Sequence, residues 1–120
     1  MNDLSLARNW IMLQYAERPS TEYDELMLNT YPIVMEMIDV DPKRSLDFIL
    51  SVIMENDSDF ILENLGAGPL EDILVYHGNE IIEEVERLAH KNIKFKLALK
   101  MTWRREILEH VWSRVVSARE

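Results

Sequence analysis

The chain has 120 residues, of which 48% are hydrophobic, and a formal net charge of −9 at pH 7. These values predict a single domain over residues 1–120 and argue against a disordered chain. The absence of cysteine excludes a disulfide framework and a thiolate metal site. The chain lacks both a secretory signal and an apolar run of about 18 residues, so we expect a cytoplasmic protein with no membrane contact.

The two parts of the chain differ in charge. Residues 1–86 hold 19 acidic and 4 basic side chains, whereas residues 87–120 hold 3 acidic and 9 basic ones. The acidic part would repel nucleic acid and attract a basic protein. We expect the basic segment to neutralise the acidic helices that it packs beside. Runs of charge are usually solvated faces, so charge alone does not identify a partner.

Residues 1–40 contain apolar stripes at helical spacing. The stripes are Leu6, Trp10 and Leu13; then Tyr23, Leu26, Met27 and Tyr31; then Ile33, Val34, Met37 and Ile38. Asn2 or Asp3 can cap the first helix. Pro32 is expected to kink or restart the second helix, because proline removes a backbone hydrogen bond.

The dipeptide Asp41-Pro42 predicts the start of a helix, with aspartate as the cap and proline in the first turn. Leu46, Ile49, Leu50 and Ile53 line one face of this helix, and Phe48 and Val52 lie on another. A helix that is apolar on two sides is normally buried between neighbours. We therefore expect it at the centre of the core, ending at residues 55–57.

All three glycines fall within residues 57–78. The signals predict a short helix that begins near Ser58 and ends at Gly66, with Gly66 in the left-handed conformation just past the helix end. A second helix would begin at Pro69 and end at Gly78. The small residues between the two helices would allow a close approach at a tight corner.

The segment Leu65-Gly66-Ala67-Gly68-Pro69-Leu70-Glu71-Asp72-Ile73-Leu74, followed by His77-Gly78, resembles the AGPLEDLL…HG core motif of a family of small bacterial proteins of unknown function. Other features are similar to the same family. Upstream of the motif these are Asp41-Pro42 and the apolar helix that follows; downstream they are the helix at 82–89, Phe95 and Trp103. The likeness covers about residues 40–112. It implies a helical fold and no known activity, so no catalytic residue is transferred.

The C-terminal part contains three more apolar stripes. They are Ile81, Ile82, Val85, Leu88 and Ala89; then Phe95, Ala98 and Leu99; then Leu108, Val111, Trp112 and Val115. Asn92 separates the first two, and residues 103–105 form a joint. No strand signal is found. The sequence therefore predicts an all-α fold of about seven short helices in an irregular antiparallel stack that resembles helical-repeat packing.

No set of side chains suggests catalysis. The histidines are His77, His90 and His110, and no two of them are spaced as metal ligands on one helix face. We expect a structural role for His77 at a helix end. An anion site at the start of the helix at Gly68-Pro69 is disfavoured, because proline removes one donor and two acids follow. We expect no enzymatic activity, no cofactor and no metal.

We predict instead an acidic protein-binding module, most concretely an immunity protein that neutralises a basic bacterial toxin such as a nuclease. A nuclease site is built for phosphate, so its inhibitors often present an acidic face. We also expect Trp103 to contact the partner, because an exposed tryptophan beside arginine is a typical interface hot spot. The candidate partner-binding residues are Glu22, Asp24, Glu25, Glu36, Asp39, Glu55, Asp57, Asp59 and Trp103.

Three alternatives stay open. The protein could be a helical adaptor or subunit of a larger bacterial assembly that uses the apolar corner. It could bind nucleic acid through the basic residues of 91–105, which predicts an affinity that falls steeply with salt. An enzyme is the remaining class, although its nucleophile, base and orienting group are not found in the sequence.

Overall fold

The structure is a computed structural model that describes residues 2–120. Over these residues the chain forms seven α-helices, one π-helical turn and no strand, which confirms the all-α prediction. The helices are α1 (Asp3–Tyr15), α2 (Thr21–Val40), α3 (Pro42–Glu55), α4 (Asp59–Leu65), α5 (Glu71–Lys91), α6 (Ile93–Leu99) and α7 (Glu109–Ala118). The π turn, η1 (Gly66–Leu70), joins α4 to α5 without a break.

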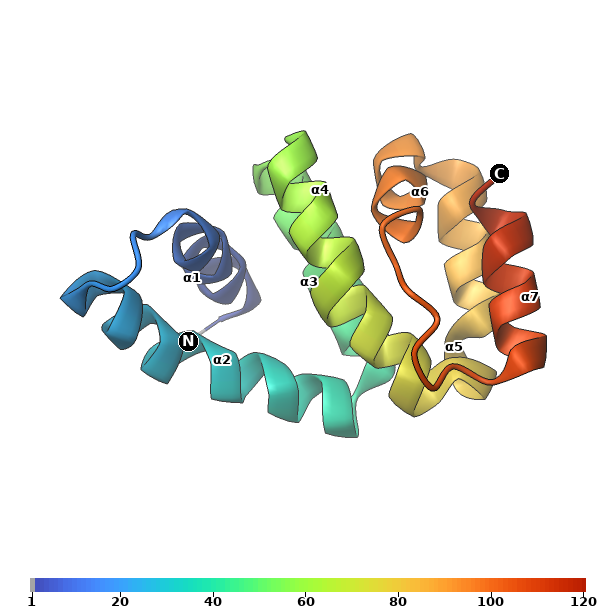
Figure 1. Ribbon diagram of the computed structural model, residues 1–120, viewed down its shortest axis with the longest axis horizontal. Coiled ribbons are helices and arrows are strands. Elements are labelled where there is room, and N and C mark those ends of the chain that lie inside the picture. The colour runs from blue at the N-terminus through green and yellow to red at the C-terminus, as the bar shows by residue number, and fades with distance from the viewer. Residues whose placement is uncertain (1) are drawn as a thin grey trace.

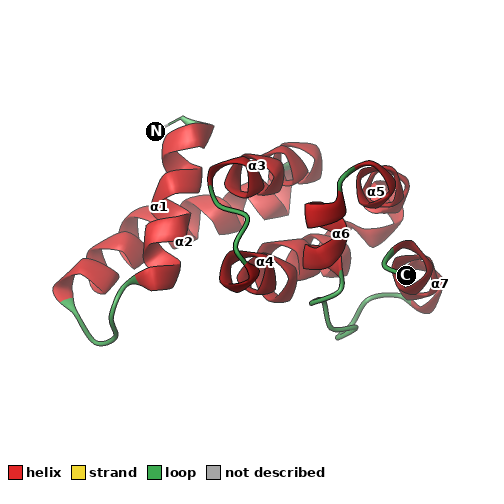
Figure 2. Cartoon of the chain, turned by 90° about the horizontal axis from the view of Figure 1, so that it is seen from above, coloured by secondary structure: helices red, strands yellow, loops and turns green. Residues whose placement is uncertain are grey.

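The helices form an elongated stack that measures 42 × 27 × 25 Å. Helix α1 lies at one end, α3 and α4 occupy the middle, and α5, α6 and α7 form the other end (Figure 1). Helix α2 runs along the lower edge from the α1 end to the start of α3. Seen from above, α3 and α4 lie side by side between the α1–α2 pair and α6 (Figure 2). None of the described helices combines the length and the apolar run that crossing a bilayer requires.

Side-chain caps begin several helices, and those at Asn2, Asp41 and Ser58 lie where the sequence predicts them. Asn2 accepts from the Ser5 N–H at 2.8 Å, and Asp41 accepts from the Arg44 N–H at 3.1 Å. Ser58 accepts from the Ile61 N–H at 3.3 Å, and Asn92 caps α6. Each such cap contributes about 1 kcal/mol, because it pairs an amide that the helix leaves free. The short range of these signals explains why the sequence predicts them well.

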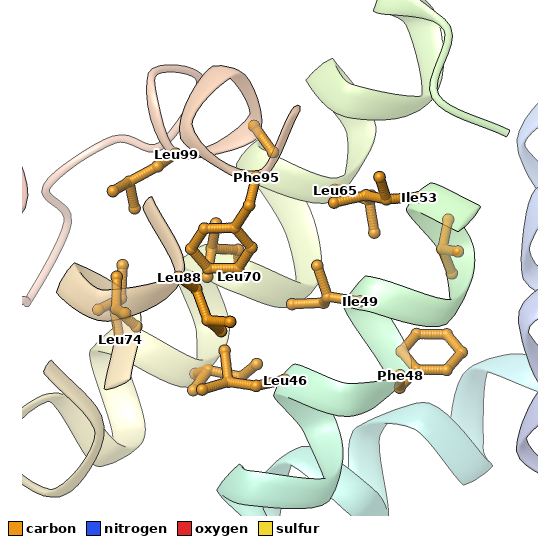
Figure 3. Packing of buried hydrophobic residues seen from close by; sticks show 14 of the residues in the cluster. Leu46, Phe48, Ile49, Ile53, Leu65, Leu70, Leu74, Leu88, Phe95 and Leu99 are labelled. Carbon is orange, nitrogen blue, oxygen red and sulfur yellow. The ribbon is translucent and has the colours of Figure 1, made fainter. Parts of the chain in front are cut away.

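Helix α3 is the centre of the core, as the sequence predicts. Leu46, Phe48, Ile49 and Val52 are all buried. Ile49 points toward α4 and α6, whereas Phe48 lies on the opposite side of α3 (Figure 3). There its ring meets the edge of Trp10 from α1, with 6.5 Å between the ring centroids. Helix α3 therefore joins the two ends of the stack into one hydrophobic core.

The expectation that Pro32 kinks or restarts the helix is wrong. Residues 21–40 form the single helix α2, with Pro32 inside it. Pro32 and Leu28, the residue one turn before it, are both exposed. Water can therefore solvate the Leu28 carbonyl that proline leaves without an N–H partner, so the lost hydrogen bond is tolerated.

The predicted corner at Gly66 is also wrong. Gly66 is right-handed, with φ −65° and ψ −44°, and no described glycine has a positive φ. The chain continues through η1 into α5 and bends only at His77, whose φ of −134° and ψ of 23° are not helical. The His77 Nε2–H donates to the Ile38 carbonyl of α2 at 2.7 Å. The structural role predicted for His77 is therefore confirmed, at a kink that replaces the expected helix end.

Close packing, and not backbone freedom, accounts for Gly66. A Cβ atom at this position would lie 2.0 Å from the Ala98 carbonyl oxygen and 2.7 Å from Met101 Cβ. The residue that approaches is therefore at the end of α6, and not in the helix that follows the glycines. Gly68 differs, because a Cβ there would meet no atom within 4 Å.

We expect Gly66→Ala and Gly68→Ala to change stability in opposite directions. The Gly66 variant forces the backbone of α6 away and should lower the free energy of unfolding by about 3 kcal/mol, the upper end of overpacking costs. The Gly68 variant should raise it by up to about 1 kcal/mol, because alanine restricts the unfolded chain. Urea denaturation followed by circular dichroism measures both, and equal effects would contradict this account of the glycines.

The basic C-terminal segment neutralises acids of α5, as the sequence analysis expects. Arg114 of α7 donates from Nε to Glu86 Oε2 at 2.9 Å, and Arg105 contacts Glu71 and Asp72. The hydrogen bond from Arg114 lowers the pKa of Glu86 below its ordinary value of 4.5. The Glu86–Arg114 pair therefore stabilises the attachment of α7 only while Glu86 is ionised.

The lowered pKa of Glu86 sets a pH dependence. Its contribution to stability is fully present above the ordinary pKa of Glu86, which the unfolded chain retains, and is lost as the pH falls through the lower folded pKa. Arg114→Gln should lower the stability slightly at pH 7, because the pair is partly exposed, and the difference from wild type should shrink as the pH falls below about 4. Thermal unfolding from neutral to acidic pH tests this. In a Glu86→Gln background the Arg114 substitution should have no pH-dependent effect.

Candidate protein-binding surface

Helix α2 carries acidic charge that the rest of the protein does not neutralise. Its 20 residues include no base. Its acids, all exposed, are Glu22, Asp24, Glu25, Glu36 and Asp39. None of them forms an ion pair with any residue of the described chain. By contrast, each of α1, α3, α5 and the α3–α4 joint has at least one acid that pairs with arginine or lysine.

The remaining predicted acids, Glu55, Asp57 and Asp59, lie away from α2. Glu55 pairs with Arg8 at 3.2 Å, and Asp57 lies 3.9 Å from Lys94, while Asp59 is exposed in the first turn of α4. These residues lie at the end of α3 or just after it, whereas α2 ends where α3 begins (Figure 1). The 14 residues of α3 separate the two places by about 21 Å. The structure therefore does not bring all the predicted acids into one patch.

The acids of α2 also divide between two sides of that helix. Asp24, Leu28, Tyr31, Met35 and Asp39 follow one another at intervals of three or four residues, so they share one side. We call these five residues the α2 stripe. Leu28 is 76% exposed and Tyr31 is 51% exposed. The stripe is thus an accessible apolar strip with an acid at each end, whereas Glu25 and Glu36 lie on another side of α2.

A groove of about 320 Å³ lies beside the α2 stripe, between α1, α2, η1 and the start of α5. Trp10 of α1 and Tyr23 and Met27 of α2 line it, together with Tyr31 and Met35 of the stripe. Its other wall includes the small residues Ala67 and Gly68. The sequence places Tyr31 and Met27 on one helix face but does not predict this groove. Predicting it would require knowing how helices that are distant in the chain pack together.

Trp103 lies on a different surface, in the connection between α6 and α7, and it is 74% exposed. Its backbone N–H donates to Glu71 Oε1 at 2.6 Å. Arg105 adopts a positive φ of 47° and donates from Nη1 to Glu71 Oε2 at 3.2 Å and to Asp72 Oδ1 at 2.7 Å. These bonds, first to Asp72 and then to Glu71, raise the pKa of Arg105.

Glu71 organises this connection, which we call the Trp103 loop (residues 100–108). Glu71 is only 5% exposed, and both oxygens of its carboxylate accept hydrogen bonds from the loop. The bonds offset the cost of about 1–3 kcal/mol for a non-glycine residue with positive φ. Lys100 and Arg104 are exposed beside Trp103, so the loop presents a basic and aromatic surface, unlike α2.

The histidines take part in contacts between elements. His77 bonds to α2, and His110 of α7 bonds to the Asn79 side chain of α5. Across residues 2–120, no group of three or more His, Asp or Glu side chains is arranged to hold a metal ion. The described surface presents an acidic helix, an apolar groove and an exposed tryptophan whose backbone N–H is bonded to Glu71.

A family of unknown function, DUF6869, matches residues 16–120. The chain belongs to this family. The match begins upstream of the motif-based likeness and includes the whole of α2, the groove wall at 67–68 and the Trp103 loop. No curated protein and no solved structure matches the chain. That the members are small bacterial proteins stays a prediction.

For this DUF6869 chain we expect Glu71→Ala to release the Trp103 loop. The variant leaves the Trp103 N–H and Arg105 without a buried acceptor, so stability should fall by about 2–3 kcal/mol, as for hydrogen bonds to charged groups. Hydrogen exchange should show lost protection at the Trp103 amide. Glu106→Ala removes an exposed acid from the same loop and should leave that amide protected. Unchanged exchange in Glu71→Ala would show that other contacts hold the loop.

Proposed function

We propose that the protein is an acidic protein-binding module whose helix α2 binds a basic partner, most concretely as an immunity protein that neutralises a basic bacterial toxin such as a nuclease. The observation that carries this proposal is the charge on α2, which no basic side chain of the described chain pairs. A basic protein surface would supply the missing counter-charges.

The stability of α2 does not account for its acids. Acidic residues in the first turn favour a helix, so Glu22 and Asp24 could serve that purpose. Glu36 and Asp39 lie near the C-terminal end, where the helix dipole disfavours an acid by about 0.3–1 kcal/mol, and no base stands in the last turn. Asp41 already caps the following helix, so Asp39 is not needed there. These two acids reduce stability, which supports a role in binding.

The test removes the charge of α2 and retains its shape. One variant carries Asp24→Asn, Glu25→Gln, Glu36→Gln and Asp39→Asn; the matched control carries the same number of amide replacements at Asp47, Glu80, Glu83 and Glu109, which are exposed and unpaired. The partner is isolated from the protein's own cells at low salt, identified by mass spectrometry and titrated by calorimetry.

We expect a basic partner whose affinity falls at moderate salt. The α2 variant should weaken binding by at least about tenfold, or 1.4 kcal/mol, and the control variant by much less. An immunity role further predicts that the wild-type protein, but not the α2 variant, restores growth to cells that express the partner. An acidic or neutral partner, or equal binding by the two variants, would contradict the proposal.

The Trp103 loop favours a second candidate function, a helical adaptor in a larger assembly. Trp103 stands on a rigid basic surface that is chemically opposite to α2, so the protein could hold two different partners. In the same titrations, an adaptor partner bound at this loop would tolerate the α2 variant and be lost on Trp103→Ala.

A further inference from the structure

We propose that the groove beside α2 binds one amphipathic helix of the partner, with an apolar side and a basic residue near each end of that side. This inference rests on the proposed function and deepens it, because it names the segment through which a basic partner would bind. Helix-in-groove binding is a recurring mode of peptide recognition, in which apolar residues spaced along one helix face serve as anchors.

The α2 stripe sets the length and polarity of this helix. Asp24 and Asp39 are 15 residues apart, and the three residues between them on the stripe are apolar. The acids are therefore separated by about 22 Å along α2, or about four helical turns. A partner helix lying along α2 would place its apolar side on Leu28 and Tyr31 and a lysine or arginine opposite each acid.

The stripe and the groove form one continuous apolar surface. Tyr31 and Met35 belong to the stripe and also line the groove, where Met27 and Trp10 extend the lining inward. Methionine side chains are flexible and polarisable, so they adapt to an inserted apolar residue. A residue such as leucine from the partner helix can thus enter the groove while its neighbours cover the exposed Leu28.

The opposite wall allows a helix backbone to come close. At Gly68 a Cβ would meet no atom within 4 Å, and the backbone there does not have a positive φ. Neither packing nor conformation within the chain thus requires a glycine at this position, in contrast to Gly66. Ala67 beside it is small and exposed. These two small residues in the wall leave room for the backbone of a docked helix.

The charge around the groove selects a basic helix over an acidic one. Residues 16–40 hold six acids and one base, Arg18. The Arg18 guanidinium lies over the Tyr23 ring, 4.4 Å from its centroid, and Asp72 on the other wall is paired with Arg105. Arg18 keeps its positive charge beside the groove, but the charges on α2 itself are all negative and outnumber it, so a helix with acidic ends would be repelled.

The probes are two synthetic helical peptides of about 18 residues, long enough to span the stripe. They share one leucine-rich side, and one carries lysine at both ends where the other carries glutamate. Methyl NMR of the methionines reports where they bind. Met27 and Met35 line the groove, whereas Met54, which is 87% exposed at the end of α3, serves as an internal control.

We expect the lysine peptide to shift the methyl signals of Met27 and Met35 but not that of Met54. Gly68→Leu, which fills the groove from a position with free space, should weaken this binding at least tenfold while the melting temperature stays near that of wild type. The double variant Asp24→Asn/Asp39→Asn should weaken binding of the lysine peptide more than Glu25→Gln/Glu36→Gln. The second variant removes the same amount of charge from α2, but from a different side of the helix.

Equal binding of the two peptides, shifts at Met54, or unchanged affinity in Gly68→Leu would overturn the proposal. So would light scattering that shows a dimer which Gly68→Leu dissociates, because a second copy of the chain would then occupy the groove. If the isolated partner binds Gly68→Leu normally but is lost by the variant without α2 charge, the proposed function stands and the groove proposal fails. If the partner binds both variants normally, the proposed function itself fails.

Discussion

The contact between Gly66 and Ala98 is the constraint on which the C-terminal half of the structure depends. Because position 66 has no side chain, the end of α6 can pack directly on the continuous helix formed by α4, η1 and the part of α5 before the kink at His77. The chain leaves α6 within hydrogen-bonding reach of Glu71, which fixes the Trp103 loop. The loop in turn delivers α7 to the second half of α5, where Val111 packs against Gly78. A larger residue at position 66 would therefore disturb the packing of α6, the Trp103 loop and α7 together.

Local signals made much of the fold predictable. Caps act over three residues, so Asn2, Asp41 and Ser58 marked helix starts correctly. The two apolar sides of α3 likewise revealed its central position. The errors arose where one residue type has two uses. Glycine ends helices and also permits close packing, and at Gly66 the approach of α6, a contact distant in sequence, decided between them.

The candidate site was predictable only in part. The acids of α2 and Trp103 were evident as charge and as an aromatic residue beside arginines, and the structure shows them exposed. Which acids remain unpaired could not be read from the sequence, because Arg8 and Lys94 reach Glu55 and Asp57 only in the folded chain. The groove was missed because Trp10, Tyr31 and Gly68 come from three separate segments that only tertiary packing brings together.

The order of the helices in the stack has an electrical consequence. Residues 1–63 hold 13 acids and 4 bases, so they carry the entire net charge, whereas residues 64–120 hold 9 acids and 9 bases. The first segment, mainly α1 to α4, occupies one end and the middle of the long axis, and the second, α5 to α7, occupies the other end (Figure 1). The part of the molecule formed mainly by α1 to α4 is therefore negatively charged, and the part formed by α5 to α7 has no net charge. In the field of a cationic surface it would turn its α1–α2 end forward before contact, which favours productive collisions and rapid association.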